Sequence, residues 1–459
     1  MKTAIVRLKG MQSMTATYKA FEVDLPVIND KTFNIADLGA VSGGKVPCTE
    51  AIKKAIDTAS GQGGGRILIP NGIWLTGPIV LKSGIDLHLE DNAVLIFTKN
   101  KEDYPLVVTD YEGIKRIRTV SQISAEGAEN ISISGGGTIN GNGHLWRPVK
   151  QFKMTERQWK ALLQKSEYII DSKEGGVWVP TKSIYDARYA GEVFPDDYET
   201  EEEALKKADA YYDFYRPVMV SLRHCKKVLL DGVRFQNSPA WIIHPYFCED
   251  LTIRNISVNN PYYAQNGDGI DVDSCNRVHI HHCDLQTGDD GICLKSGKDR
   301  EARKITGPCQ NVFIHDCKVG QSHGGFVIGS EMSRGVRNVL VKDCTFIDSD
   351  VGIRFKSALG RGGVVEDIFM EDIQMINIRS ESVILTMDYV HNLMDYNDPV
   401  SQSTDPEDIP KFRGIYFKRC ICPDENACHK IKALEGYPDS IHDVYFEECH
   451  LGNQEHDRR

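Results

Sequence analysis

Four short polar phrases in the second half of the chain carry the residue types that acid–base chemistry needs. They are Asn266-Gly267-Asp268-Gly269, Thr287-Gly288-Asp289-Asp290-Gly291, Ser322-His323-Gly324-Gly325 and Arg354-Phe355-Lys356. Carboxylates that converge repel one another, so one of them keeps its proton while another stays ionised. An acid beside a base is what cleavage of a glycosidic bond requires, and two nearby cations are suited to holding a carboxylate.

Taken alone, each phrase also has an ordinary structural explanation. Gly-Asp-Asp-Gly is typical of an exposed turn, and Arg354 with Lys356 is typical of a solvated strand face. Asp289 and Asp290 are neighbours, and neighbours on a regular strand point to opposite faces. Both can serve one site only at a turn or bulge, which the flanking glycines permit. The chemistry therefore depends on the element that positions the phrases.

A repeating phrase of alternating apolar and polar residues runs from about residue 128 to the end of the chain. Instances are Val228-Leu-Leu-Asp-Gly-Val, Leu251-Thr-Ile-Arg-Asn-Ile, Val278-His-Ile-His-His-Cys, Val312-Phe-Ile-His-Asp-Cys and Val339-Leu-Val-Lys-Asp-Cys. Alternation with period two predicts half-buried strands, and spacings of roughly 20 to 35 residues indicate a solenoid or a propeller. The short runs and the lack of a Trp-Asp signature favour an all-β parallel solenoid.

Stacking of repeats gives the four phrases a common face. In a solenoid, residues one repeat apart lie above one another, so phrases at successive repeats build one surface cluster. Arg354 and Lys356 are two residues apart on a strand and point to the same side. We therefore expect one carboxylate-rich site with a cationic grip.

Two helical regions are expected to flank the strands. Residues 49–59 form an amphipathic pattern that would cap the first repeat, with Thr49 as its N-cap. Residues from about 145 to 215 break the repeat and hold two capping boxes, which begin at Thr155 and Thr200. We expect an N-terminal extension over residues 1–30 and a single domain over 31–459, with 145–215 inserted as a cleft wall, a lid or a surface decoration.

Composition excludes several classes of partner. The net charge of −11 argues against nucleic acid, and no stretch of roughly 18 apolar residues would span a membrane. The charged residues before Leu25 leave no secretory signal, so we expect an intracellular protein, or a periplasmic or secreted one if a signal was removed. The 13 cysteines include Cys225, Cys283 and Cys317 beside apolar runs, which favours buried thiols over disulfides or metal ligands.

In these motifs the chain resembles glycoside hydrolase family 28, the polygalacturonases. That family shows Asn-Thr-Asp, Gly-Asp-Asp, Gly/Ser-His-Gly and Arg-Ile-Lys in this order; here Gly267 stands for the Thr and Phe355 for the Ile. The resemblance begins at Asn34-Ile-Ala-Asp-Leu-Gly-Ala and is strongest between about 235 and 365. It implies a right-handed parallel β-helix.

The resemblance also implies the role of each residue. It makes Asp289 the acid that protonates the leaving oxygen, Asp268 and Asp290 the carboxylates that activate water, and His323 a residue that orients the acid. Binding of the substrate's carboxylate falls to Arg354 and Lys356, with Asn266 beside them. Family members invert the anomeric carbon, for which the general rule expects carboxylates about 6.5–9.5 Å apart. The insertion and residues 329–333 resemble those of exo-acting members, so we expect terminal galacturonate to be released from a pectic chain.

Other functions stay open at this point. A hydrolase of the same family could act on rhamnogalacturonan or xylogalacturonan, and a lyase on the same solenoid could use several Asp as calcium ligands. A solenoid that only binds polysaccharide is the alternative from another class. We expect no cofactor and no metal site, since His279 and His281 face one side of a strand, His282 faces the other, and no second ligand pair has zinc-like spacing. The oligomeric state is left open.

Overall fold

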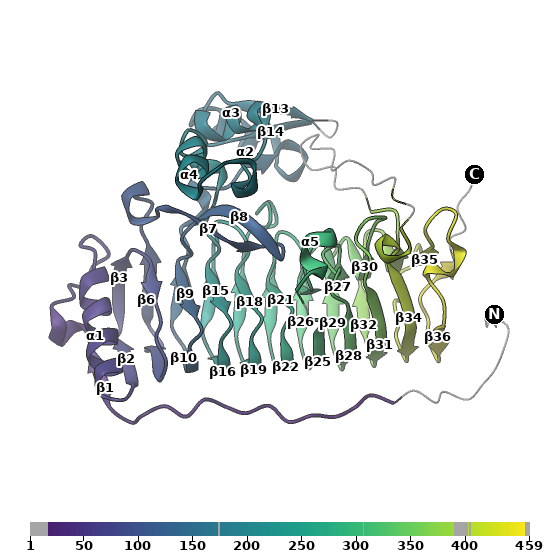
Figure 1. The fold of residues 1–459 in the computed structure, drawn as a ribbon, viewed down its shortest axis with the longest axis horizontal. Helices are drawn as coiled ribbons and strands as arrows, with labels where there is room; N and C mark the ends of the chain where they lie inside the picture. The colour runs from purple at the N-terminus through teal and green to yellow at the C-terminus, as the bar shows by residue number, and fades with distance from the viewer. Residues whose placement is uncertain (1–16, 173–174, 306, 390–402, 404, 455–459) are drawn as a thin grey trace.

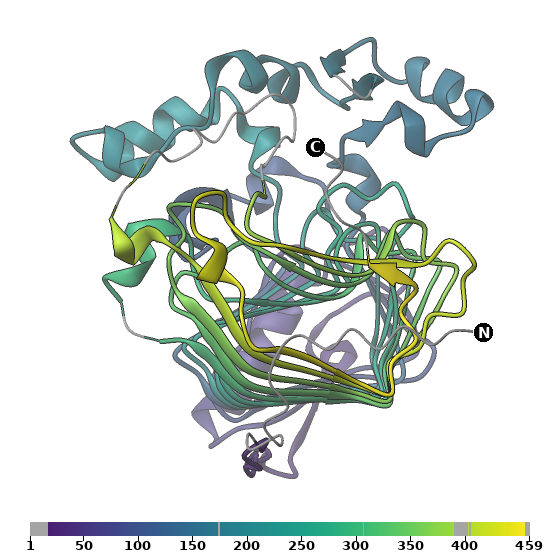
Figure 2. The same cartoon turned by 90° about the vertical axis from the view of Figure 1, so that its right-hand side faces the viewer.

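Parallel strands stack into a β-helix in the computed structural model, which describes residues 17–172, 175–305, 307–389, 403 and 405–454. Each coil contributes one strand to each of three long sheets, and the coils follow one another along a single axis (Figure 1). Viewed along that axis, the coils superpose around a common interior (Figure 2). The predicted parallel solenoid is confirmed.

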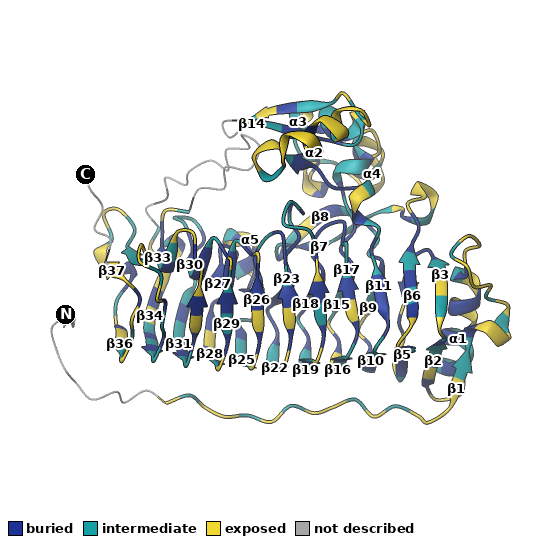
Figure 3. Ribbon diagram, turned by 180° about the vertical axis from the view of Figure 1, so that it is seen from behind, coloured by how far each residue is buried: buried dark blue, intermediate teal, exposed yellow. Residues whose placement is uncertain are grey.

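The first sheet contains, within the described residues, twelve strands. Their order is β1 (Thr32–Asn34), β2 (Gly65–Ile69), β5 (Ile85–Leu89), β10 (Glu129–Gly135), β16 (Lys226–Asp231), β19 (Glu249–Arg254), β22 (Asn276–His281), β25 (Cys309–His315), β28 (Val336–Lys342), β31 (Val364–Glu371), β34 (Lys411–Lys418) and β36 (Val444–Glu447). The alternating phrases found in the sequence lie on these strands. Figure 3 shows buried and more exposed residues alternating along them.

The second and third sheets complete each coil. The second runs β3 (Gly72–Thr76), β6 (Ala93–Phe97), β11 (Thr138–Asn140), β17 (Arg234–Gln236), β20 (Ser257–Asn259), β23 (Asp284–Gln286), β26 (Lys318–Gly320), β29 (Thr345–Ile347) and β32 (Gln374–Ile376). The third runs β4 (Ile79–Val80), β9 (Ile123–Glu126), β15 (Val220–Arg223), β18 (Ile243–Tyr246), β21 (Ile270–Asp273), β24 (Ile292–Lys295), β27 (Gly324–Gly329), β30 (Val351–Lys356), β33 (Glu381–Thr386), β35 (Cys428–Lys432) and β37 (Asn453–Gln454).

Rows of identical or similar side chains fill the interior of the stack. Val228, Leu251, Val278, Val312 and Val339 are paired in register along the first sheet and are all buried. All thirteen cysteines are free thiols, and eleven of them are buried. Small apolar side chains repeated at one position per coil pack tightly on one another, which is the role predicted for the cysteines.

Helix α1 (Thr49–Gly61) covers the N-terminal end of the stack, as predicted, and buries Ile52, Ala55 and Ile56 (Figure 1). The prediction for its cap was wrong. Cys48 precedes the helix without a side-chain cap, while the Thr49 hydroxyl accepts a hydrogen bond from Gly77 N–H at 2.7 Å. Thr49 thus ties the helix to the turn between β3 and β4.

The inserted residues form a helical layer above the stack (Figures 1 and 2). Thr155 caps α2 (Glu156–Leu163) with both bonds of a capping box, and Thr200 caps α4 (Glu201–Asp209) through Glu203 N–H. Helix α3 (Lys182–Ala190) and the antiparallel strands β12 (Val149–Lys150), β13 (Ile169–Ser172) and β14 (Gly175–Trp178) were not predicted.

Shorter elements complete the chain. They are the hairpin β7 (Leu106–Tyr111) and β8 (Ile114–Thr119), helix α5 (Asp299–Arg303) and the 3₁₀ turns η1 (Ile35–Leu38), η2 (Lys101–Asp103), η3 (Gly143–Leu145), η4 (Gln151–Lys153), η5 (Pro195–Asp197), η6 (Tyr212–Phe214), η7 (Pro406–Asp408) and η8 (Pro438–Ser440). None of the helices in the described part of the chain is both long and apolar enough to cross a bilayer.

An N-terminal strap, residues 17–31, runs along the outside of the stack (Figures 1 and 3). Lys19 exchanges two hydrogen bonds of 2.9 Å with the Asn338 side chain, and Val27 N–H donates to Asn130 Oδ1 at 2.9 Å. The strap therefore contacts coils that lie far apart in the stack. Residues 1–16 of the predicted extension lie outside the described residues.

Candidate active site

The carboxylates lie in segments that lead into neighbouring strands of the third sheet. Asp268 precedes β21, Asp289 and Asp290 precede β24, and His323 precedes β27. The backbone ladder continues into these segments, because Gly269 N–H donates to the Asp290 carbonyl at 2.9 Å and His323 N–H to the Asp289 carbonyl at 3.0 Å. One oxygen of each of the three Asp side chains lies within 4.8 Å of the others. The predicted carboxylates thus come together as one cluster.

Glycines permit the close approach of these segments. A Cβ on Gly288 would lie 2.5 Å from the Ala264 carbonyl oxygen, and one on Gly267 would lie 2.9 Å from the Ala264 side chain. A threonine at position 267 therefore has no room in this packing. Phe355, the other departure from the family pattern, is fully buried and packs in the interior.

His323 connects Asp289 to the insertion. Its Nδ1 lies 3.0 Å from Asp289 Oδ1, and its Nε2 lies 2.9 Å from Lys153 Nζ. Lys153 also donates to the carbonyls of Gly288 at 3.1 Å and Tyr262 at 3.3 Å. An ammonium group has three donors and no acceptor, so Nε2 of His323 accepts the third hydrogen bond. The Nδ1–H of His323 donates to Asp289.

A cationic group borders the cluster on the other side. Lys356 Nζ donates to Asp290 Oδ2 at 2.7 Å and is almost fully buried. Arg354 and Lys356 both lie over the Tyr389 ring, 5.5 and 5.1 Å from its centre. The Nε of Arg354 is buried without a hydrogen-bond partner in the described structure. Arg354 therefore has a donor to offer to a ligand, whereas Lys356 already holds the carboxylate of Asp290.

Burial and mutual repulsion separate the acidities of the three carboxylates. Burial raises the pKa of Asp268 well above its ordinary value, and the charges of Asp271 and Asp289 add to the rise. Burial acts in the same direction on Asp289, but His323, Lys356 and Lys153 together outweigh it and hold the pKa of Asp289 below its usual range. In the free protein Asp268 therefore holds a proton more tightly than Asp289 does.

A second layer of buried ionisable side chains lies next to the carboxylate cluster. Lys295 Nζ lies 3.0 Å from Glu331 and 3.6 Å from Asp271, and all three side chains are buried. Burial raises the pKa of Asp271 to about 8, although Lys295 opposes the rise. Neither carboxylate oxygen of Asp271 has a hydrogen-bond partner among the described residues. At neutral pH Asp271 is therefore largely protonated, and the charges that remain in this layer are those of the Lys295–Glu331 ion pair.

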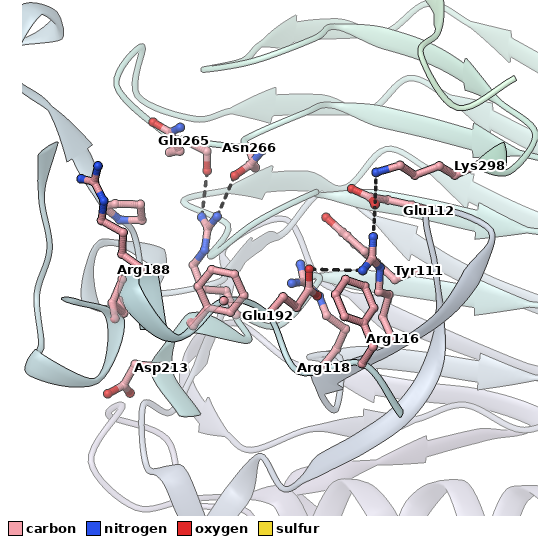
Figure 4. A pocket seen from close by; sticks show the side chains of 16 residues that line it. Tyr111, Glu112, Arg116, Arg118, Arg188, Glu192, Asp213, Gln265, Asn266 and Lys298 are labelled. Atoms are coloured by element: carbon pink, nitrogen blue, oxygen red, sulfur yellow. Dashed lines mark hydrogen bonds and ion pairs between the residues drawn. The ribbon is translucent and has the colours of Figure 1, made fainter. Parts of the chain in front are cut away.

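A cavity of about 410 Å³ opens between the β7–β8 hairpin, the insertion and the stack (Figure 4). Its lining includes Arg116, Arg118, Arg188, Arg216 and Lys298, against the acids Glu112, Glu192 and Asp213. Arg116 is paired with Glu112 at 3.2 Å and Glu192 at 3.3 Å. The Nε of Arg118 is buried without a partner in the described residues, and its guanidinium lies 3.9 Å from the centre of the Tyr111 ring. The cavity is therefore suited to an anion.

Asn266 joins the cavity to the carboxylate cluster. Its backbone N–H donates to Asp289 Oδ2 at 3.2 Å, and its side-chain oxygen accepts from Arg216 Nη2 at 2.7 Å (Figure 4). Asn266 was predicted to bind substrate, and that prediction remains untested. In the free protein, its backbone already orients Asp289.

Three important residues were missed by the sequence analysis. Lys153 lies in the insertion and Arg216 directly follows it, and nothing in the local sequence sets either of them apart from other surface cations. Tyr389 follows β33 without any motif. Only the fold shows that these residues reach the cluster.

Two groups of side chains among the described residues could hold a metal ion. One is the carboxylate cluster itself, and the other consists of His282, His315 and Asp316. The second group was not anticipated, because His315 and Asp316 come from the next coil, where His315 pairs in register with His281. The expectation of no metal site stays a prediction.

Comparisons with known proteins identify the family. Residues 201–409 match the family Glycosyl hydrolases family 28. The crystal structure of a hyperthermoactive exopolygalacturonase from Thermotoga maritima is 32% identical, with a TM-score of 0.71 and coverage of 90% of this chain and 86% of that one. The chain belongs to glycosyl hydrolase family 28. An exo-poly-alpha-D-galacturonosidase from Dickeya chrysanthemi is 28% identical over 92% of this chain and 67% of its own length.

Membership of this family establishes the general activity of the protein. The protein is a glycoside hydrolase that degrades pectin, as the resemblance implied. A family 28 exopolygalacturonase from Yersinia enterocolitica shares the fold, with a TM-score of 0.70 at 21% identity and coverage of 93% of this chain and 76% of that one. The expected absence of nucleic-acid and membrane partners and the expected location stay predictions.

Proposed function

We propose that the protein hydrolyses α-galacturonide bonds from the end of a pectic chain, in one displacement that inverts the anomeric carbon. The observation that carries the proposal is one continuous site: three carboxylates lie between the cation pair Arg354 and Lys356 and a basic cavity beneath the insertion. A chain of carboxylated sugars matches cations on both sides of the cleaved bond.

The three carboxylates differ in exposure, and this supports different roles. Asp289 keeps 16% of its side chain exposed, whereas Asp268 and Asp290 are 4% and 2% exposed. Asp289 can therefore meet the glycosidic oxygen and protonate it. In the same step, water attacks the anomeric carbon and gives its proton to the carboxylate of Asp268 or Asp290.

The separation of carboxyl groups expected from the general rule for inverting enzymes, about 6.5–9.5 Å, stays a prediction. One oxygen of each of the three carboxylates lies within 4.8 Å of the others. One water can still accept and donate hydrogen bonds between Asp268 and Asp290, since two contacts of about 2.8 Å span a separation of this size. The burial of both residues favours attack by such a small nucleophile over direct attack by a carboxylate.

Asp289 must hold a proton to act as the acid, yet its pKa is low in the free protein. A bound galacturonate brings negative charge to the cluster, and negative charge raises the pKa of a neighbouring carboxyl group. Substrate binding thus favours the protonated form of Asp289, which is the form that acts as the acid. This proposal makes the ionised substrate part of the catalytic apparatus.

The cavity supports action at a chain end. It is lined by the β7–β8 hairpin and by the insertion, which close one side of the cleft next to Asn266 (Figure 4). A volume of about 410 Å³ is in the range of small-molecule sites and too small for a long polymer. The terminal galacturonate occupies the cavity, and the next unit lies toward Arg354.

A time course with defined galacturonide oligomers tests the proposal. Monomer as the first product from every chain length supports terminal action, while a mixture of shorter oligomers at early times contradicts it. Proton NMR of the first-formed sugar distinguishes the mechanism, because inversion of an α-linkage releases the β-anomer. Early α-anomer would overturn the single displacement, and a product with ultraviolet absorbance would indicate elimination.

A further inference from the structure

A second basic cavity is lined in part by residues of the insertion. Its volume is about 530 Å³, and Asp213 lines both cavities. Residues of the insertion and of loops between the sheets enclose it. We call it the lysine cavity, and the residues that define it are Lys99, Lys101, His144, Trp146, Arg147 and Lys165.

Positive charge dominates this cavity in a chain whose net charge is −11. Asp213 is the one acid in its lining, and it lies 3.3 Å from Lys101. Lys99 and Lys165 make no ion pair with any described residue. Both lysines, together with Arg147, lower the pKa of His144, in addition to the effect of its burial. The cations therefore lie close enough to repel one another, which an anion would relieve.

Arg147 at the base of the cavity is a buried cation without a counter-ion. It is 1% exposed, and its guanidinium donates to the Ser238 carbonyl and, at 2.8 Å, to Asn237 Oδ1. Neither partner carries charge, and burial lowers the pKa of Arg147 to about 10. Its Nε has no partner among the described residues. Buried charges are normally paired, so this guanidinium marks a place for an anion.

Aromatic side chains make up the rest of the base. Trp146 and Trp178 are each 4% exposed, and Tyr263 also lines the cavity. The indole N–H of Trp146 is a second buried donor without a partner in the described structure. Aromatic faces with a few polar groups are suited to a ligand with both apolar C–H surfaces and hydrogen-bonding groups. A carboxylated sugar has both, whereas a simple inorganic anion lacks the apolar surface.

We propose that the lysine cavity is a second binding site for a galacturonate unit, separate from the carboxylate cluster. The carboxylate pairs with Arg147 and the lysines, and the sugar ring packs on the aromatic base. This inference rests on the proposed function for the class of sugar. The bound unit belongs either to a distant part of the pectic substrate or to the released product.

Calorimetry with galacturonate and with a galacturonide oligomer tests this site in the Asp289→Asn background, where turnover does not deplete the ligand. Two variants separate the sites: Lys99→Gln with Lys165→Gln removes two cations of the lysine cavity, and Arg354→Gln weakens the cleft. Lys160→Gln is the matched control, since Lys160 is an exposed lysine of the same insertion and bonds to Glu156. Galactose and inorganic phosphate test the need for charge and for a sugar.

The expected result is two binding events, one of which weakens at least tenfold in the lysine-cavity variant and is unchanged by Arg354→Gln and Lys160→Gln. Binding of the monomer assigns the site to product, and binding of the oligomer alone assigns it to substrate. A single event that only Arg354→Gln weakens would overturn the inference, as would phosphate binding as tight as galacturonate. Reducing-sugar release by the unmutated protein reports the proposed function separately.

Discussion

Replacing Lys153 with methionine tests how the insertion controls the catalytic acid. Lys153 reaches from the end of η4 to His323 Nε2 at 2.9 Å, and His323 in turn donates to Asp289. Methionine has a similar length and removes the charge and all three donors. His323 Nε2 then lacks its hydrogen-bond donor, while Asp350 Oδ2 lies 3.8 Å away. We expect the ring to turn toward Asp350 and to lose its alignment with Asp289.

The expected loss in kcat follows from the energy of the hydrogen bond that Lys153 donates to His323. A hydrogen bond from a charged donor contributes about 1.5–3 kcal/mol. If that energy is lost in the transition state, kcat falls roughly 10- to 150-fold, at about 1.36 kcal/mol per factor of ten. A ring that turns toward Asp350 also no longer orients the carboxyl group of Asp289 for proton transfer. The loss is therefore expected in kcat more than in KM.

The assay is the pH dependence of kcat and of kcat/KM on a galacturonide trimer. In Lys153→Met, kcat should fall across the whole pH range, and the limb that reports Asp289 should move to higher pH, because one of the cations that lower the pKa of Asp289 is gone. Lys153→Arg, which keeps a charged donor, should restore part of kcat, and Lys160→Met on α2 serves as the control. An unchanged kcat with an unchanged pH profile in folded Lys153→Met would refute the reasoning.

Three further predictions follow from the site. Arg354→Gln should lower kcat/KM on galacturonides by at least tenfold, as loss of a charged hydrogen bond implies, and an equal loss on a neutral substrate would contradict this role. Because substrate binding raises the pKa of Asp289, activity should be lost at a higher pH in the profile of kcat, which reports the complex, than in that of kcat/KM, which reports the free enzyme. Loss at the same pH in both profiles would argue against this effect of the substrate. Folded Asp271 has a pKa of about 8, above its unfolded value, so it binds more protons when folded and stability falls as pH rises toward 8. Asp271→Asn should flatten that fall by up to about 4 kcal/mol between pH 5 and pH 8, since one proton contributes about 1.36 kcal/mol per pH unit, and thermal unfolding at the two pH values measures it. An unaltered slope would exclude Asp271 as its source.

The parallel stack was predictable because alternation restricts each coil. A residue such as Val278 must face the interior, and a shift by one residue would expose every buried side chain of its strand. Register then follows from coil to coil, which is why the sequence alone places Asp268, Asp290 and His323 on one face.

The insertion could not be predicted to the same degree. Its capping box at Thr155 is a local signal, and α2 begins there as expected. The position of Lys153 against His323 depends instead on how the whole layer packs on the stack, for which the sequence has no periodic pattern. Likewise, His282 lacked a visible partner because His315 is distant in sequence and adjacent only after stacking.

The N-terminal strap has a consequence for how the protein unfolds. A stack of coils is held by contacts between nearest neighbours, so its end coils can open independently of the rest. The strap ties Lys19 to Asn338 and Val27 to Asn130, which couples coils more than two hundred residues apart in sequence. Opening the coils around Asn338 therefore requires release of the strap, and the strap makes a one-dimensional array behave as a more cooperative unit.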